Sequence, residues 1–142
     1  MKTSARNYFE GTVKQVKSGA VNDEVVLDVG HDTVITATIT KESTENLSLG
    51  QGSKAFALIK SSSVIFATDM DGIKLSTRNC LAGTVDKVTP GAVNSEVLLK
   101  LASGQHITAI ITNESCKNMN LSAGVKACAI FKASQVILGV KV

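Results

Sequence analysis

The sequence predicts an all-β protein with short helices, built as two tandem five-stranded barrels. Three observations support this prediction. The second half of the 142-residue chain repeats the first at a constant offset of 72 residues, without insertion or deletion. Apolar residues alternate with polar ones in short segments that end at glycine or other turn residues. Within one copy these segments amount to five short strands and one helical segment. Two copies of one small β domain therefore follow each other.

The repeat is clearest in four segments that carry the same residues in the same order. Because no loop has changed length between the copies, both halves are expected to have the same fold. The predicted domains are residues 1–68 and 73–142, joined by a short Asp-Gly turn at Asp71 and Gly72. The four repeated pairs are Ser4–Asn7 with Ser76–Asn79, Gly19–Asn22 with Gly91–Asn94, Thr36–Ser43 with Thr108–Ser115, and Lys60–Ile65 with Lys132–Ile137.

The first two strands of a copy are defined by alternation and by the turns that follow them. Residues 8–16 end at Lys17-Ser18-Gly19, a turn sequence. Residues 24–29 place Val25, Leu27 and Val29 on one face before Gly30 ends the run. Both segments are therefore predicted to be half-buried strands.

A third strand, a helix and two further strands complete the copy. Residues 33–40 are rich in Thr and Ile, which favour strands. Residues 41–47 open with hydroxyl and acidic side chains and precede Gly50 and Gly52, so they are predicted to form a short helix. Residues 54–60 and 64–66 follow as strands. A helix between the third and fourth of five strands indicates an OB-like Greek-key barrel.

Composition limits the class of protein. Apolar residues make up 44% and the mean hydropathy is +0.18, a high apolar content for two small barrels, so part of this surface is expected to meet another subunit. The net charge is +3, without a basic run of the kind found in nucleic-acid-binding tails. The amino terminus has no apolar secretion or membrane segment, which predicts a cytoplasmic protein.

The sequence contains no pattern typical of an enzyme or of a metal site. His31 aligns with Ser103 and His106 with Val34, so neither histidine belongs to the repeat. Cys80, Cys116 and Cys128 occur only in the second copy and are interpreted as reduced structural thiols, not as ligands or a disulfide framework. We therefore expect no catalysis, no catalytic cofactor and no direct protein ligands to a metal.

The repeated residues that a core does not explain are mostly hydrogen-bond donors. They include hydroxyls, amides, Arg6 and Lys60, with their equivalents in the second copy. Ser43 also lies near the predicted helix start, where unpaired N–H groups favour negative charge. Donors with few carboxylates favour a fully deprotonated oxyanion such as molybdate, tungstate or sulfate over phosphate, which keeps a proton near neutrality.

These motifs, in this order and each repeated, resemble the molbindin family, specifically its tandem two-domain (di-Mop, molybdenum-pterin-binding) members of the ModG type. The resemblance implies Mop/TOBE-like barrels, a homotrimer, and molybdate or tungstate held at subunit and domain interfaces for molybdenum storage, transport and homeostasis. It implies the following oxyanion-binding residues: Ser4, Ala5, Arg6, Asn7, Ala20, Val21, Asn22, Ser43, Lys60, Ser61 and Ser62, and Ser76, Thr77, Arg78, Asn79, Ala92, Val93, Asn94, Ser115, Lys132, Ala133 and Ser134.

The second copy departs from the motif at three positions. Thr77 replaces Ala5, Ala133 replaces Ser61 and Asn113 replaces Lys41. A contact through the Ser61 hydroxyl would be lost at Ala133, so the two kinds of site are expected to differ in affinity. Sites that combine residues of both repeats are also compatible with the pattern.

Three alternatives remain open at this stage. An OB-type nucleic-acid-binding module would need stacking aromatics and a basic groove, whereas the chain has one Tyr, four Phe and no Trp. The effector half of a molybdate-responsive regulator or transporter ATPase would carry the same domain, but no helix-turn-helix or nucleotide-binding segment is expected before Met1. A molybdopterin ligand would need an apolar slot, which the donor-rich loops do not suggest.

Overall fold

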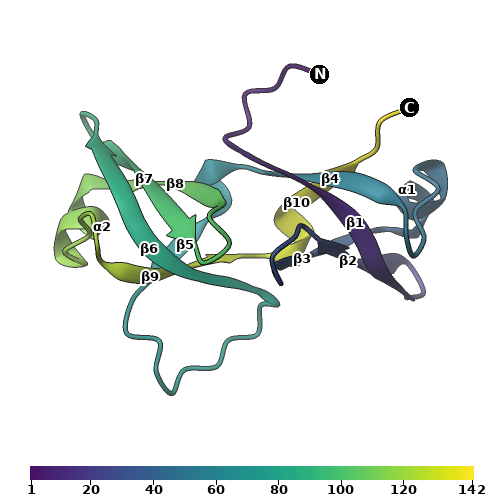
Figure 1. The fold of residues 1–142 in the computed structure, drawn as a ribbon, viewed down its shortest axis with the longest axis horizontal. Helices are drawn as coiled ribbons and strands as arrows, with labels where there is room; N and C mark the ends of the chain where they lie inside the picture. Colours follow the sequence, from purple (N-terminus) through teal and green to yellow (C-terminus); the bar gives the residue numbers. More distant parts are fainter. The chain divides into compact units, whose positions relative to one another are not determined.

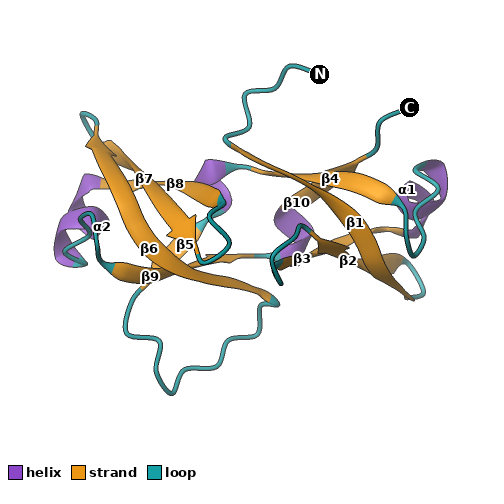
Figure 2. Ribbon diagram, viewed as in Figure 1, coloured by secondary structure: helices purple, strands orange, loops and turns teal.

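The structure, a computed structural model, describes residues 1–142 and consists of ten strands, two α-helices and two short 3-10 helices (Figures 1 and 2). The predicted strands and helix of the first copy are all present, with ends shifted by a few residues. The elements of the first repeat are β1 (Asn7–Ser18), β2 (Asn22–Asp28), β3 (Val34–Thr40), α1 (Lys41–Asn46), β4 (Lys54–Ile59), η1 (Ser61–Ser63) and β5 (Ile65–Ala67). Those of the second are β6 (Asn79–Pro90), β7 (Asn94–Leu101), β8 (His106–Thr112), α2 (Asn113–Asn118), β9 (Lys126–Phe131), η2 (Ala133–Gln135) and β10 (Val136–Gly139).

Each repeat is built around one long strand that pairs on both sides. β1 pairs with β4 through its first half and with β2 through its second half. The register shifts between Val13 and Gln15, and such a bulge lets a long strand bend. Gly11 lies where β2 crosses closely: a Cβ there would stand 2.2 Å from the carbonyl oxygen of Asp28. A glycine is therefore required at this bend of β1.

The two repeats exchange their last strands. The strand order of one sheet is β10-β4-β1-β2-β3, and that of the other is β5-β9-β6-β7-β8, with antiparallel pairing throughout. β10 thus completes the sheet of the first repeat, and β5 that of the second (Figure 1). The first and last strands of each sheet also contact each other, so each sheet curls into a partly closed barrel.

This exchange sets the boundaries of the compact units. The first unit contains residues 1–60 and 132–142, and the second contains residues 61–131. These boundaries differ from the predicted domains 1–68 and 73–142. An offset of 72 residues shows which segments of the two repeats are equivalent. It does not show whether a strand pairs within its own repeat or with the other repeat. The turn at Asp71 and Gly72, predicted to join the domains, lies inside the second unit, between β5 and β6.

The core of each unit therefore contains side chains from both repeats. In the first unit, Val136 and Leu138 of β10 are buried beside the strands of the first repeat, while Val64 and Phe66 contribute to the second unit. The remaining core residues follow the predicted alternation, with a β-strand period of two. In the first unit they are Phe9, Val13, Val25, Leu27, Val29, Ile35, Ala37, Leu49, Ala55, Ala57 and Ile59.

Candidate functional site

The strand register brings three of the predicted segments to one end of the first sheet. Asn7 of β1 lies opposite Ile59 of β4, and Ile59 lies opposite Val136 of β10. Further predicted contact residues lie near this row along the chain. They are Arg6 at the start of β1, Lys60 after β4, and Lys132, Ala133 and Ser134 ahead of β10.

The strand exchange determines which copy of each segment enters each unit. The first unit combines Ala5 with Ala133, whereas the second combines Thr77 with Ser61. At each of these two equivalent positions, the second unit therefore has a side chain with a hydroxyl group and the first unit has an alanine. Each unit therefore contains predicted contact segments from both repeats, and the two units differ chemically at these positions.

The Thr77 hydroxyl holds the chain that enters β6. Its Oγ1 donates to the carbonyl oxygen of Phe131 at 2.8 Å and accepts from the N–H of Asn79 at 3.3 Å. Ala5 can make neither bond, and its own N–H donates to Thr3 Oγ1 at 3.1 Å. Thr77 therefore ties the backbone at Asn79 to the end of β9.

Asn7 and Asn79, both predicted to contact the oxyanion, lie under the surface at the start of β1 and β6. They are 2% and 1% exposed. No buried side-chain nitrogen or oxygen in the structure lacks a hydrogen-bond partner, so these amides are already satisfied. Their burial places them beneath the exposed residues of the same segments, which include Arg6 and Arg78.

A second cluster joins the Gly-Ala-Val-Asn turn to the following helix. Asn22 pairs with Thr40 at the end of β3, and the N–H of Lys41 donates to the carbonyl oxygen of Val21 at 2.9 Å. In the second copy, the N–H of Asn113 donates to Val93 at 2.8 Å. The turn residues Ala20–Asn22 and Ala92–Asn94 are exposed. In each unit the backbone hydrogen bond therefore joins an exposed turn to the start of the helix.

The amide of Ser43 is not available to an anion, contrary to the simple expectation for a helix start. Thr40 is the N-cap of α1, and its Oγ1 accepts from the Ser43 N–H at 3.1 Å. The Thr40 hydroxyl also donates to Ser43 Oγ at 2.8 Å. Ser115 has the same arrangement with Thr112 in α2. Because Ser43 Oγ and Ser115 Oγ accept in these bonds, each serine hydroxyl can still donate its own proton. The Thr-x-x-Ser spacing in the sequence indicates this cap.

A charged network beneath the turn was not predicted from the sequence. Asp23 is 3% exposed; its carboxylate accepts from the Gly19 N–H at 3.2 Å and lies 3.6 Å from Lys41 Nζ. A side-chain hydrogen bond with Thr44, together with Gly19 and Lys41, lowers the pKa of Asp23 despite the opposing effect of burial. Lys41 Nζ also donates to Ser18 Oγ at 3.0 Å. This network fixes the turn against the start of α1.

The second copy replaces this network with a neutral one. The Ser95 hydroxyl donates to Asn113 Oδ1, and Asn113 Nδ2 donates to the carbonyl oxygen of Gly91 at 2.9 Å. Ser95 and Asn113 occupy the positions of Asp23 and Lys41, and Cys116 occupies that of Thr44. The same turn is thus held by an ion pair in one unit and by uncharged groups in the other.

We expect acid to loosen the first turn selectively. Because the pKa of Asp23 is lower in the folded protein, its contribution to stability is present above the unfolded value of about 3.9 and is lost as the pH falls through the folded value. Replacing Asp23→Ser together with Lys41→Asn copies the second unit and should flatten the fall in melting temperature below pH 5. Thermal unfolding followed from pH 3 to pH 7 measures this. An unchanged acid profile would contradict the role of Asp23.

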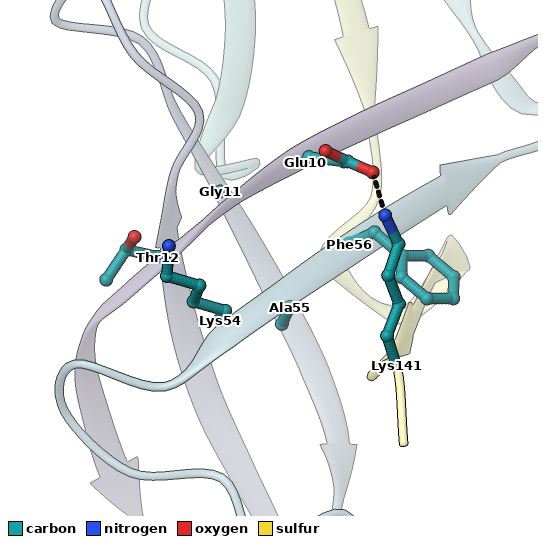
Figure 3. Close-up of a pocket in the computed structure, with 7 residues that line it drawn as sticks. All are labelled: Glu10, Gly11, Thr12, Lys54, Ala55, Phe56 and Lys141. Atoms are coloured by element: carbon teal, nitrogen blue, oxygen red, sulfur yellow. Dashed lines mark hydrogen bonds and ion pairs between the residues drawn. The ribbon is translucent and has the colours of Figure 1, made fainter.

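Most of the predicted contact residues are exposed in a single chain, but Asn7, Ser61 and Asn79 are buried. Arg6, Lys60, Arg78 and Lys132 are exposed. Two cavities lie elsewhere on the chain. The first cavity, of about 440 Å³, is lined by Glu10, Gly11, Thr12, Lys54, Ala55, Phe56 and Lys141 (Figure 3).

Glu10 pairs with Lys141, one of the two lysines that line the first cavity. Lys141 Nζ lies 2.6 Å from Glu10 Oε1, as the dashed line in Figure 3 shows. A second cavity, of about 430 Å³, borders α2 and is lined by Val88, Pro90, Ser95, Asn113, Cys116, Lys117, Asn120, Leu121 and Ser122. Neither of these two cavities is lined by a residue that the sequence predicts to bind the oxyanion.

Neither a metal-binding cluster nor a membrane-spanning helix is found in the structure. No group of three or more His, Cys, Asp or Glu side chains is placed to hold a metal ion. Neither the six-residue α1 nor the six-residue α2 has the length needed to cross a membrane, and no longer helix is present.

Comparison with known proteins identifies relatives over the whole chain. The TOBE domain model matches residues 3–66 and 75–138. The molybdenum transport protein ModE of Azotobacter vinelandii is 49% identical over 140 residues, which cover 99% of this chain and 52% of that protein. The molybdenum-pterin-binding protein MopA of Rhodobacter capsulatus is 44% identical over 138 residues, covering 97% and 52%. The chain thus spans about half the length of these curated relatives.

A solved structure matches at full length. The cytoplasmic molybdate-binding protein ModG, crystallised with molybdate bound, has a TM-score of 0.96 and 45% sequence identity, and the match covers 99% of this chain and all of that one. The prediction of an all-β fold with two five-stranded sheets is confirmed by this match. None of these relatives is named as an enzyme, in agreement with the non-catalytic role expected from the sequence.

Proposed function

Since this chain belongs to the TOBE domain family and carries the domain twice, we propose that it binds molybdate reversibly and without catalysis. The observation that carries this proposal is the full-length match to ModG, which was crystallised with molybdate. The segments predicted to contact the oxyanion are present in both copies, and the register gathers three of them at one end of the first sheet.

The chemistry of the gathered residues suits an anion that only accepts hydrogen bonds. Arg6, Lys60 and Lys132 supply positive charge, and the exposed turns and hydroxyls supply neutral donors. Charge-assisted hydrogen bonds of this kind are about twice as strong as neutral ones. Molybdate and tungstate are dianions without a proton at neutral pH, so this donor set favours either of them over phosphate.

Assembly into a homotrimer would enclose these surfaces. A strong anion site needs partial exclusion of water, yet most of the predicted contact residues are exposed in the single chain. Large apolar side chains are exposed at equivalent places in both copies: Val21 and Val93 at 72% and 70%, and Ile65 and Ile137 at 61% and 64%. Burying this surface between copies would complete the sites and couple occupancy to assembly.

We further propose that the protein stores or buffers the oxyanion in the cytoplasm and supplies it for transport and molybdenum homeostasis. Reversible binding through side chains and backbone groups needs no covalent step and leaves the ligand chemically unchanged. Two units with different hydroxyl and charge patterns would release the oxyanion over a wider concentration range than identical sites. This difference follows from Ser61 and Thr77 in one unit and Ala133 and Ala5 in the other.

A second candidate function is the sensor half of a regulator. Relatives named as ModE, which include a transcriptional regulator of Yersinia pestis at 34% identity, are about twice as long as this chain. In that case the same oxyanion site would control another activity. A gel-shift measurement with double-stranded DNA, with and without molybdate, separates the two roles: storage predicts no shift, and regulation predicts one that molybdate changes.

Isothermal titration with molybdate tests the proposed function directly. We expect saturable binding that excess sulfate or phosphate does not displace, and light scattering of the same sample should give three chains per particle. Tungstate should compete with molybdate because it has the same charge and shape. The absence of any heat with molybdate, from protein shown to be folded, would overturn the proposal.

A further inference from the structure

Two cysteines lie side by side on the outer face of the second sheet. Cys80 is on β6, opposite Ile130 of β9, and Cys128 is on β9, opposite Ala82 of β6. Residues two positions apart on a strand point to the same side of a sheet, so Cys80 and Cys128 are diagonal neighbours on one face. Side chains in such diagonal pairs are within reach of each other.

The first unit shows independently that side chains at these two positions meet. Tyr8 and Phe56 occupy the places of Cys80 and Cys128 in the other repeat. Their rings stack with centroids 5.2 Å apart. In the second unit the stacked rings are replaced by two thiols, and burial together with the adjacent Cys80 thiol raises the pKa of Cys128.

The thiol pair is open to a ligand, and the third cysteine is not. Cys80 is exposed and Cys128 is half-buried. The residues paired with Cys128 on either side are Ala82 and Ala67, whose short side chains leave the sulfur uncovered. Cys116 is buried in α2, and its Sγ donates to the carbonyl oxygen of Leu121 at 3.9 Å.

The number and softness of the donors define the ligand. Structural zinc takes four ligands, and no third His, Cys, Asp or Glu side chain joins the pair. Soft thiolates favour soft ions such as Cu(I). Monovalent ions with a filled d shell can bind just two sulfur ligands, in a linear arrangement. We propose that Cys80 and Cys128 form a two-thiolate binding site for a monovalent soft metal ion, Cu(I) or its analogue Ag(I).

Binding at this site involves a defined exchange of protons. Each thiol releases one proton and forms one bond to the ion, so one Cu(I) displaces two protons and leaves a complex with one net negative charge. No electron is transferred, and the ion enters already reduced. Because the protons compete with the metal, binding should tighten as the pH rises. The site shares no residue with the proposed oxyanion site, so either can fail without the other.

The test is a titration of the reduced full-length protein with Cu(I) in competition with a chromophoric Cu(I) chelator. We expect one Cu(I) per chain, X-ray absorption showing two sulfur neighbours, and loss of that stoichiometric binding in Cys80→Ser and in Cys128→Ser. Cys116→Ser is the matched control and should bind as the unaltered protein does. Circular dichroism of each variant verifies that it is folded.

A gain of binding provides a test that does not depend on removing residues. Tyr8→Cys combined with Phe56→Cys places two thiols at the equivalent positions of the first unit and should raise the stoichiometry from one Cu(I) to two. Stoichiometric binding that survives in folded Cys80→Ser, binding that depends on Cys116, or no competition with the chelator at all would overturn the proposal. So would a folded double-cysteine variant that still binds one ion.

Discussion

Truncation of the chain after Phe131 is expected to destabilise the first unit and to leave the second intact. The removed residues, 132–142, belong to the second repeat in sequence, but they supply β10 to the sheet of the first. Their loss exposes the edge of β4 and takes Val136 and Leu138 out of the first core, where they are 3% and 8% exposed. Each such side chain contributes roughly 1.5–3 kcal/mol, a large share of the roughly 5–15 kcal/mol that stabilises a domain.

Hydrogen exchange resolved by segment measures this outcome. Amides of β4 should lose protection in the truncated protein, whereas those of β9 should keep it because β5 still covers that strand. A milder pair of variants gives matched controls: Leu138→Ala should weaken the first unit and Phe66→Ala the second, by about 2–5 kcal/mol each. Loss of protection in the second unit after truncation would contradict the strand exchange.

The sequence predicted the elements well because their causes are local. Alternation at Val25, Leu27 and Val29, and the turns that follow each strand, depend only on neighbouring residues. The constant offset of 72 residues then carried these assignments to the second copy. The exchange of β5 and β10 was not predicted, since both strands have equivalent partners in either repeat and periodicity cannot distinguish them.

The candidate site was predicted in outline and changed in detail for a similar reason. Its segments were found because the same donors recur in both repeats. The burial of Asn7 was missed because it depends on packing in three dimensions. The capping of Ser43 by Thr40 is local and was missed although the Thr-x-x-Ser spacing indicates it. The Asp23 network was missed because Ser95 replaces it in the second copy, so it left no repeated signal.

Replacement of the cations at the end of the first sheet is expected to reduce molybdate affinity strongly without unfolding the protein. Arg6 and Lys60 extend from adjacent strands at one end of this sheet, and both are exposed in the single chain. A hydrogen bond to a charged group contributes about 1.5–3 kcal/mol, so Lys60→Ala or Arg6→Ala should weaken binding roughly 10- to 100-fold. Titration calorimetry and thermal unfolding on the same samples separate affinity from stability.

A second lysine on the same strand serves as a control. It distinguishes direct contact with the oxyanion from attraction by the overall charge of the protein. Lys54→Ala removes the same charge from the other end of β4, away from the residues proposed to bind the anion, and should change affinity by less than about threefold because exposed charges are screened by salt. Lys60→Arg should retain most of the binding because it keeps a charged donor. If Lys54→Ala weakened binding as much as Lys60→Ala, attraction by net charge would explain the effect, and the assignment of Lys60 to the site would be wrong.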